Sequence, residues 1–286
     1  MQLTLALRLV STWEPFSKLP QAAQAALAES LQALQLRPGQ KLYDYDTLPP
    51  GVALLAKGQM RLLALDEQEV PFTLRRLGPG DTAGAIGLLR GTTGQALAAS
   101  QPSQLWLMPQ QAFLKAVLEN TPLQLALAQP NFEELYAVAA ASPSPRVPRR
   151  RDLRDWASNQ LEEAAQEQQV LLLPAGEHQF GSSWGPWLVS SSNVAGVSPG
   201  DELLGPLKVT VKGKLPARLL AKGGATPPLE RPPVMVLSPD AGEEEPEQAE
   251  AELLEPDWQE SSAAIVAVER QQDALEDWYG RLGDDG

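Results

Sequence analysis

Short apolar runs separated by turns dominate the first part of the chain. The runs expected to form strands cover residues 41–45, 52–56, 59–66, 70–77 and 105–108. Turn-forming sequences such as Pro49-Pro50-Gly51 lie between them, so that the strands follow one another at intervals of about ten residues. Many short strands with this spacing predict a β-sandwich or a β-barrel.

The segment before these strands carries two different patterns. Residues 1–10 alternate between apolar and polar positions, which indicates a strand. Residues 19–36 place Leu27, Leu31 and Leu34 on one face of an amphipathic helix. We therefore expect a strand and then a long helix ahead of the barrel.

Helices and a linker are predicted after the barrel. Residues 110–118 form the first helix, which offers Phe113 to the barrel, and a short helix follows near 132–141. Residues 142–148 are a Pro/Ser-rich linker. The long dimerisation helix and helix-turn-helix of a DNA-binding regulator are not expected here.

Residues 150–222 are predicted to be a shortened repeat of the barrel. Residues 155–169 are predicted to be helical. The sequence Val197-Ser-Pro-Gly-Asp201 then resembles Leu77-Gly-Pro-Gly-Asp81, and residues 216–221 resemble residues 102–107. The shorter spacing between turns predicts that at most half a barrel is repeated and that it docks on the first for burial.

The last segment of the chain differs in composition. Residues 223–286 hold 17 of the 36 acidic residues but 3 of the 23 basic ones. This acidic tail is predicted to be disordered to about residue 260. A terminal amphipathic helix follows, which either folds back on the body or docks on a partner. The negative charge of the tail disfavours nucleic acid as a partner.

The composition excludes several kinds of chemistry. There is no cysteine, and His178 is the single histidine, which argues against thiolate chemistry and multi-histidine metal sites. Ser183 lies in a Gly-x-Ser-x-Gly pattern, but a strand is expected after it where a nucleophile elbow needs a helix, so a loop is favoured over a serine hydrolase. No apolar run reaches the roughly 20 residues that span a bilayer.

A basic cluster borders the Pro/Ser-rich linker. It consists of Arg146, Arg149, Arg150, Arg151 and Arg154. A solvated linker flank explains it without any partner. The alternative is an anion contact, either to lipid headgroups or to the acidic tail of the same chain.

A glycine-rich stretch carries the most specific pattern. It runs from Gly84-Ala-Ile-Gly-Leu-Leu89 to Gly94 between two apolar runs. With Leu36-Arg-Pro-Gly39 and Leu77-Gly-Pro-Gly-Asp81 upstream, it resembles the phosphate-binding cassette of the cyclic-nucleotide-binding domain family. The resemblance implies a short helix whose N-terminal amides face a cyclic phosphate.

Two positions depart from the family pattern. The family has a Glu after the glycine that matches Gly84, where this chain has Ala85, and its phosphate-facing Arg falls at or beside Gly94 and Gln95. An uncharged residue does not replace a bidentate Arg–phosphate contact. We therefore expect a degenerate pocket, with non-binding favoured over binding. The candidate site residues are Gly84, Ala85, Ile86, Gly87, Leu88, Arg90, Gln95 and Ala96.

The expected fold class is mainly β with flanking α. A cyclic-nucleotide-binding-type β jelly-roll barrel at 12–128 precedes a helix and linker at 129–149. A second, repeated β-rich unit at 150–222 and the acidic tail at 223–286 complete the chain.

The sequence favours a non-enzymatic regulatory or scaffold module. Its barrel and Pro-rich linker look like the N-terminal regulatory portion of bacterial ABC-type peptide or protein exporters, which implies a cytoplasmic module that needs no cofactor and acts through a protein partner. The alternative is a cyclic-nucleotide receptor that binds cyclic AMP or cyclic GMP through the amides of residues 84–88 and Arg90.

Overall fold

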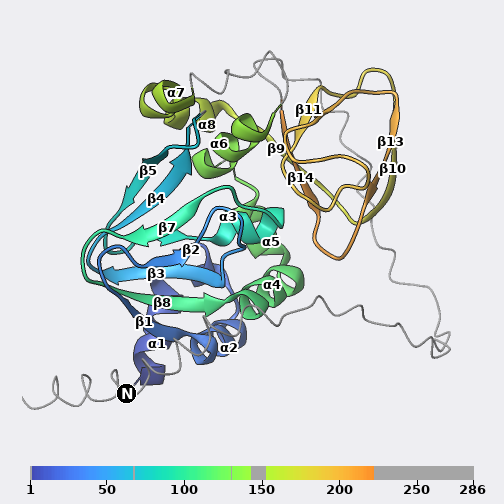
Figure 1. The fold of residues 1–286 in the computed structure, drawn as a ribbon. Coiled ribbons are helices and arrows are strands. Elements are labelled where there is room, and N and C mark those ends of the chain that lie inside the picture. Colours follow the sequence, from blue (N-terminus) through green and yellow to red (C-terminus); the bar gives the residue numbers. More distant parts are fainter. Residues whose placement is uncertain (1, 67, 130, 143–152, 222–286) are drawn as a thin grey trace, which may run out of the picture. The chain divides into compact units, whose positions relative to one another are not determined.

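The first part of the chain folds into eight short strands in two antiparallel sheets, here called the roll (Figure 1). The computed structural model describes residues 2–66, 68–129, 131–142 and 153–221. The sheets have the orders β1-β8-β3-β6 and β2-β7-β4-β5. The strands are β1 (Gln32–Leu36), β2 (Lys41–Tyr43), β3 (Gly51–Lys57), β4 (Met60–Leu65), β5 (Pro71–Leu77), β6 (Thr82–Ala83), β7 (Ala96–Ala99) and β8 (Ser103–Pro109).

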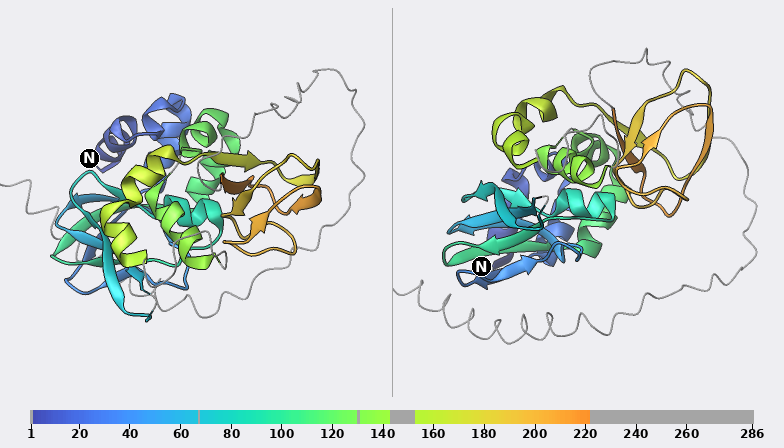
Figure 2. Two further views of the ribbon diagram at one scale, coloured as in Figure 1. Left: turned by 90° about the horizontal axis from the view of Figure 1, so that it is seen from above. Right: turned by 45° about the horizontal axis from the view of Figure 1, so that its top comes forward.

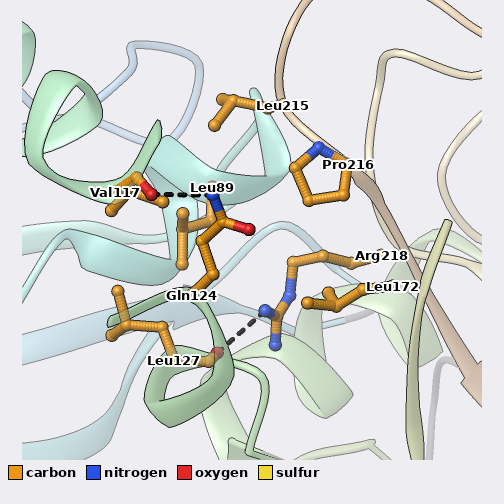
Figure 3. A pocket seen from close by; sticks show the side chains of 8 residues that line it. All are labelled: Leu89, Val117, Gln124, Leu127, Leu172, Leu215, Pro216 and Arg218. Carbon is orange, nitrogen blue, oxygen red and sulfur yellow. Dashed lines mark hydrogen bonds between the residues drawn. The ribbon is translucent and has the colours of Figure 1, made fainter. Parts of the chain in front are cut away.

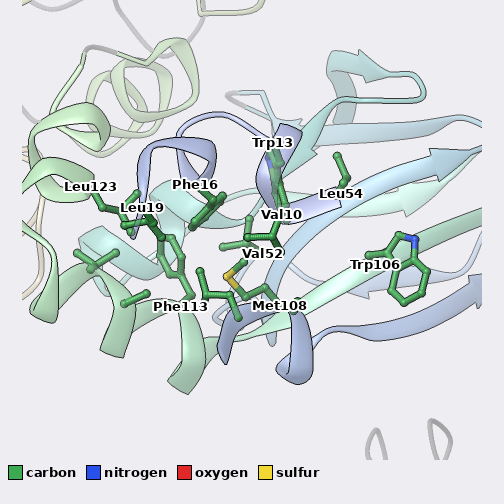
Figure 4. Close-up of a cluster of buried hydrophobic side chains, with 14 of the residues drawn as sticks. Val10, Trp13, Phe16, Leu19, Val52, Leu54, Trp106, Met108, Phe113 and Leu123 are labelled. Atoms are coloured by element: carbon green, nitrogen blue, oxygen red, sulfur yellow. The ribbon is translucent and has the colours of Figure 1, made fainter. Parts of the chain in front are cut away.

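The main hydrophobic core lies between the sheet that contains β3 and β8 and the helices that cover it (Figure 4). Phe16 and Phe113 meet edge to face at 6.2 Å, beside the fully buried Met108. Aromatic pairs in this geometry add to the free energy that burial itself supplies. The covering helices are α1 (Gln2–Thr12), α2 (Gln21–Ser30), α3 (Ala85–Arg90), α4 (Gln110–Glu119) and α5 (Thr121–Leu127).

Two predictions for the segment before the roll are wrong. Residues 1–10 do not form a strand, because α1 covers this segment and buries Ala6 and Val10 one helical turn apart, with the buried Trp13 just after its end. The helix predicted at 19–36 ends at Ser30, and its last part is strand β1, which pairs with β8.

Three further helices cover the other sheet. Tyr136 on α6 (Phe132–Ala141) packs edge to face on Phe72, and its hydroxyl donates to the Leu65 carbonyl at 3.1 Å. The helix predicted at 155–169 is two helices, α7 (Leu153–Asn159) and α8 (Leu161–Glu167). Together they bury the face of the β4–β5 pair that would otherwise be open.

Six strands with their own core form residues 170–221, here called the β unit (Figure 2). They make one sheet of order β12-β11-β14-β9 and a two-stranded sheet of β10 and β13. Val189, Val209 and Leu219 are in its core. The strands are β9 (Val170–Leu173), β10 (Gly176–Phe180), β11 (Trp187–Val189), β12 (Glu202–Leu203), β13 (Leu207–Val211) and β14 (Ala217–Ala221).

The fold is thus mixed α and β with antiparallel sheets, and it contains more helix than the sequence led us to expect. Among the described residues, none of the helices is both long and apolar enough to cross a bilayer. The predicted acidic tail, its terminal helix and most of the predicted linker, with Arg146 and Arg149 to Arg151, lie outside the described residues.

Candidate functional site

The predicted cassette helix is present as α3, and glycines hold both of its ends. Gly84 caps the N-terminus with φ 95°, and a Cβ added there would lie 2.6 Å from the Gly51 carbonyl oxygen. Gly91 caps the C-terminus with φ 67°. Any other residue at Gly84 would meet both a strained backbone and a collision.

The other predicted site residues on α3 contribute mainly to packing. Ile86 and Leu88 are buried in the main core, with Ala85 packed against it. Gly87 lies against Pro49, since a Cβ added there would be 3.2 Å from that ring. Helix α3 is therefore fixed by apolar contacts along its length.

Gln95 uses its side chain to bind α6. It is 6% exposed, and its Nε2 donates to the main-chain carbonyl of Glu133 at 2.9 Å. The neighbouring Ala96 is fully buried at the start of β7. Of the two residues at or beside which the family resemblance expects a phosphate-facing Arg, Gly94 and Gln95, the second uses its side-chain amide to hold the first turn of α6.

The Glu133 side chain is itself buried inside the roll. Asn131 caps α6 by accepting a hydrogen bond from the Glu133 main-chain nitrogen at 2.7 Å. The Glu133 carboxyl interacts electrostatically with Arg75 on β5 and with Tyr43 on β2. Burial raises its pKa to about 7, although the positive charge of Arg75 acts in the opposite direction. The same burial raises the pKa of the Tyr43 hydroxyl.

Replacing Gln95 with Leu should lower the free energy of unfolding by about 1 kcal/mol, because a buried hydrogen bond is lost while the volume is nearly kept. Urea denaturation measures the change. Gln101→Leu on the exposed surface is the control and should leave stability unchanged. An unchanged midpoint for Gln95→Leu would contradict a role for this amide in holding α6.

Arg90, the predicted substitute cation, faces away from the roll interior toward the β unit. It is 3% exposed, and its Nε donates to both the carbonyl oxygen and the hydroxyl of Ser190, at 3.1 and 2.9 Å. Burial lowers its pKa to about 10, partly offset by Glu134. Arg90 therefore stays charged near neutral pH, but its charge is directed into a buried contact.

Arg90 belongs to a buried polar cluster, which we call the junction: Arg90, Glu134, Ser190 and Arg218. Arg218 on β14 binds Glu134 on α6 in a bidentate pair of 2.8 and 2.7 Å, and Ser190 Oγ donates to Glu134 at 2.6 Å. The Arg218 Nη1 also donates to the Leu127 carbonyl at 2.8 Å (Figure 3). No local pattern in the sequence links residues 90, 134, 190 and 218, so this cluster could not be predicted from the sequence.

Two cavities lined by described residues differ in size and in place. One of about 20 Å³ lies among Leu89, Gln124, Leu215 and Arg218, and has room for about one water molecule (Figure 3). The other, of about 530 Å³, is a polar hollow between β5 and the α7–α8 turn. Neither is lined by residues 84–88. Among the described residues, no group of His, Asp or Glu side chains is arranged to hold a metal ion.

Comparison with known proteins gives one family match and a set of distant folds. Residues 33–120 match the model of the cyclic nucleotide-binding domain. No curated protein matches the chain.

The solved structures are similar at low identity. The sensor domain of the transcriptional regulator DNR from Pseudomonas aeruginosa is 21% identical, with 44% of this chain and 85% of that chain covered and a TM-score of 0.41. The regulatory subunit of a cAMP-independent protein kinase A from Trypanosoma brucei is 15% identical, with 44% and 46% covered and a TM-score of 0.40. This chain thus spans less than half of that subunit.

A cyclic nucleotide-binding-like protein from Brucella abortus is 22% identical, with 40% of this chain and 98% of that chain covered and a TM-score of 0.34. The family match by itself places a cyclic nucleotide-binding domain at residues 33–120.

Proposed function

We propose that the chain is a non-enzymatic regulatory module whose nucleotide pocket is degenerate and closed by its own helix α6. The observation that carries this proposal is the hydrogen bond from Gln95 to Glu133, because it gives the expected phosphate anchor an internal partner. The neutral Ala85 supports the same view, since a ribose hydroxyl would find no carboxylate there.

We further propose that the β unit is a reduced copy of the roll. The order β9-β14-β11-β12 repeats β1-β8-β3-β6. The pairings Leu54–Trp106 and Leu54–Thr82 have counterparts in Leu188–Leu220 and Leu188–Glu202. Such agreement in register along two sheets supports duplication with loss of one hairpin and of the cassette helix.

The turns before β6 and β12 support the same duplication. Gly80 donates to the Leu55 carbonyl at 2.8 Å, and Gly200 donates to the Val189 carbonyl at 2.7 Å. In each turn the aspartate that follows the glycine accepts from a main-chain nitrogen three residues earlier, at 2.8 Å for Asp81 and 2.7 Å for Asp201.

We propose that such a module acts through a partner protein, which is a chain of an export system. We further propose that the module lies on the cytoplasmic side. We propose that the chain is divided into domains or segments at residues 12–128, 129–149, 150–222 and 223–286. A module with a closed pocket would pass on a signal through its contacts with that partner. Ser183 lies in a turn before strand β11, and His178 Nε2 contacts the Pro174 carbonyl at 2.8 Å.

Isothermal titration calorimetry of the full chain tests the proposal. Cyclic AMP and cyclic GMP at up to about 1 mM should give no saturable heat, and neither should raise the melting temperature. Saturable micromolar binding that is lost in Arg90→Ala but kept in Ser190→Ala would instead establish a receptor with Arg90 as its cation. Ser190→Ala is the matched control, because it removes the partner of Arg90 but keeps the guanidinium.

A further inference from the structure

The first turn of α6 contacts two different parts of the molecule through consecutive residues. The Glu133 carbonyl accepts the hydrogen bond from Gln95 of the roll at 2.9 Å. The Glu134 carboxylate, which is fully buried, binds Arg218 and Ser190 of the β unit. Both contacts lie within one helical turn of α6, and Ser190 also binds Arg90 of the roll. While Glu134 is bound to the docked β unit, α6 is therefore held at the roll.

The β unit also holds the C-terminal end of the cassette helix. The Ser192 main-chain nitrogen donates to the Arg90 carbonyl at 2.8 Å, and its hydroxyl donates to the Gly91 carbonyl at 3.0 Å. Carbonyl groups at a helix C-terminus need such partners because the helix itself provides none. Segment 190–192 thus gives α3 a second fixed end besides Gly84.

Segment 190–192 follows strand β11 directly. In the proposed duplication β11 corresponds to β3, after which the roll continues into the β4–β5 hairpin. Asn193 stabilises the segment, since its Nδ2 donates to the Lys212 and Leu215 carbonyls at 3.2 and 2.9 Å. A short, internally bonded loop therefore takes the place of a hairpin and reaches the roll.

The charges at the junction disfavour a partly docked β unit. Arg90 and Arg218 repel each other, and Glu134 is the anion that faces both. A buried ion pair is stable only when its remaining donors and acceptors are bonded, which Ser190 and the Leu127 carbonyl achieve here. Partial withdrawal of the β unit would leave buried charge without a partner, so intermediate positions are disfavoured.

We infer that the β unit is a built-in ligand of the cassette helix and of α6, and that its docking at the junction keeps α6 inside the roll. The inference rests on the proposed function in taking α6 as the helix that closes the roll. Docking of the β unit and opening of the roll then exclude each other. A partner that binds the β unit through Ser190 and Arg218 would release α6, and a molecule that displaces α6 would release the β unit.

Native-state hydrogen exchange of the full chain tests the coupling. Arg218→Met keeps the side-chain stem but removes the guanidinium that binds Glu134 directly. We expect the amides of residues 135–139 in α6 and 88–92 at the end of α3 to be accelerated at least about tenfold more than those of β3 and β8, which report the loss of global stability. Lys208→Met removes an exposed ion pair of the same unit and should change neither set.

The reverse experiment uses the reciprocity of coupled equilibria. Gln95→Leu, which weakens the hold of the roll on α6, should accelerate exchange of the Ser192 amide, although the two residues do not share a partner. Ser190→Ala provides a second variant if Arg218→Met does not fold, and should accelerate the same amides less. Acceleration confined to the β unit, or equal acceleration in β3 and β8, would overturn the inference. The nucleotide titration decides the proposed function separately.

Discussion

Replacing Arg218 with Met should lower the free energy of unfolding by about 3–5 kcal/mol, the largest single effect that we expect in this protein. The Arg218 and Glu134 side chains are 3% and 0% exposed. The variant would leave a buried carboxylate with a serine hydroxyl as its remaining side-chain partner, which the folded state tolerates poorly. Urea denaturation at neutral pH measures the change.

Lys208→Met is the matched control for this prediction. Lys208 and Glu177 form an ion pair of 2.6 Å in the same β unit, but their side chains are well exposed to solvent. An exposed pair contributes about 0–1 kcal/mol because water screens it and the side chains lose entropy. Equal losses in both variants would show that the junction contributes no more than a surface pair.

Replacing Glu133 with Gln should stabilise the protein by up to about 3 kcal/mol at pH 8 and leave its stability nearly unchanged at pH 4. The carboxyl of Glu133 is buried in the roll, and its pKa is raised from 4.5 to about 7. The folded state therefore binds this proton more tightly than the unfolded state. The corresponding stability is fully present below about pH 4.5 and is lost as the pH rises to about 7.

The difference between wild type and Glu133→Gln isolates this proton, because the other titrating groups are common to both proteins. Urea denaturation of the two proteins between pH 4 and pH 8 gives the difference curve. Glu29→Gln, at an exposed position of α2, is the control for the change from carboxylate to amide. A difference curve for Glu133→Gln that does not exceed the curve for Glu29→Gln would mean that the Glu133 carboxyl is ionised at little cost.

The roll could be predicted from the sequence because its signals are local. The turns at Pro49-Pro50-Gly51 and Leu77-Gly-Pro-Gly-Asp81 fix where strands end, and the strands between them alternate or run apolar. The cassette helix was predictable for the same reason, since Gly84 and Gly91 adopt left-handed backbone conformations that other residues disfavour.

The N-terminal helix could not be predicted from alternation alone. In residues 1–10 the apolar positions fit a strand, but Ala6, Val10 and Trp13 also recur at intervals of four and three residues, the spacing of a buried helix face. Strand β1 was missed because its pairing partner, β8, lies some 70 residues further along the chain, and such pairing overrides local helix propensity.

The site was predictable in its parts but not in its contacts. That Ala85 and Gln95 are uncharged is visible in the sequence, whereas the partner of Gln95 lies 38 residues away. Arg90 meets Ser190 over a separation of 100 residues. A single sequence carries no signal for such pairs, so the buried contact of Arg90 could not be predicted.

The NMR signal of the Gln95 side-chain amide distinguishes a closed pocket from an open one, because that amide lies where the phosphate anchor is expected. With cyclic AMP or cyclic GMP added to about 1 mM, a closed pocket predicts an unchanged chemical shift and continued protection from exchange, since the amide stays bound to Glu133. A saturable shift with loss of protection would contradict it, because α6 would then have given way to a nucleotide.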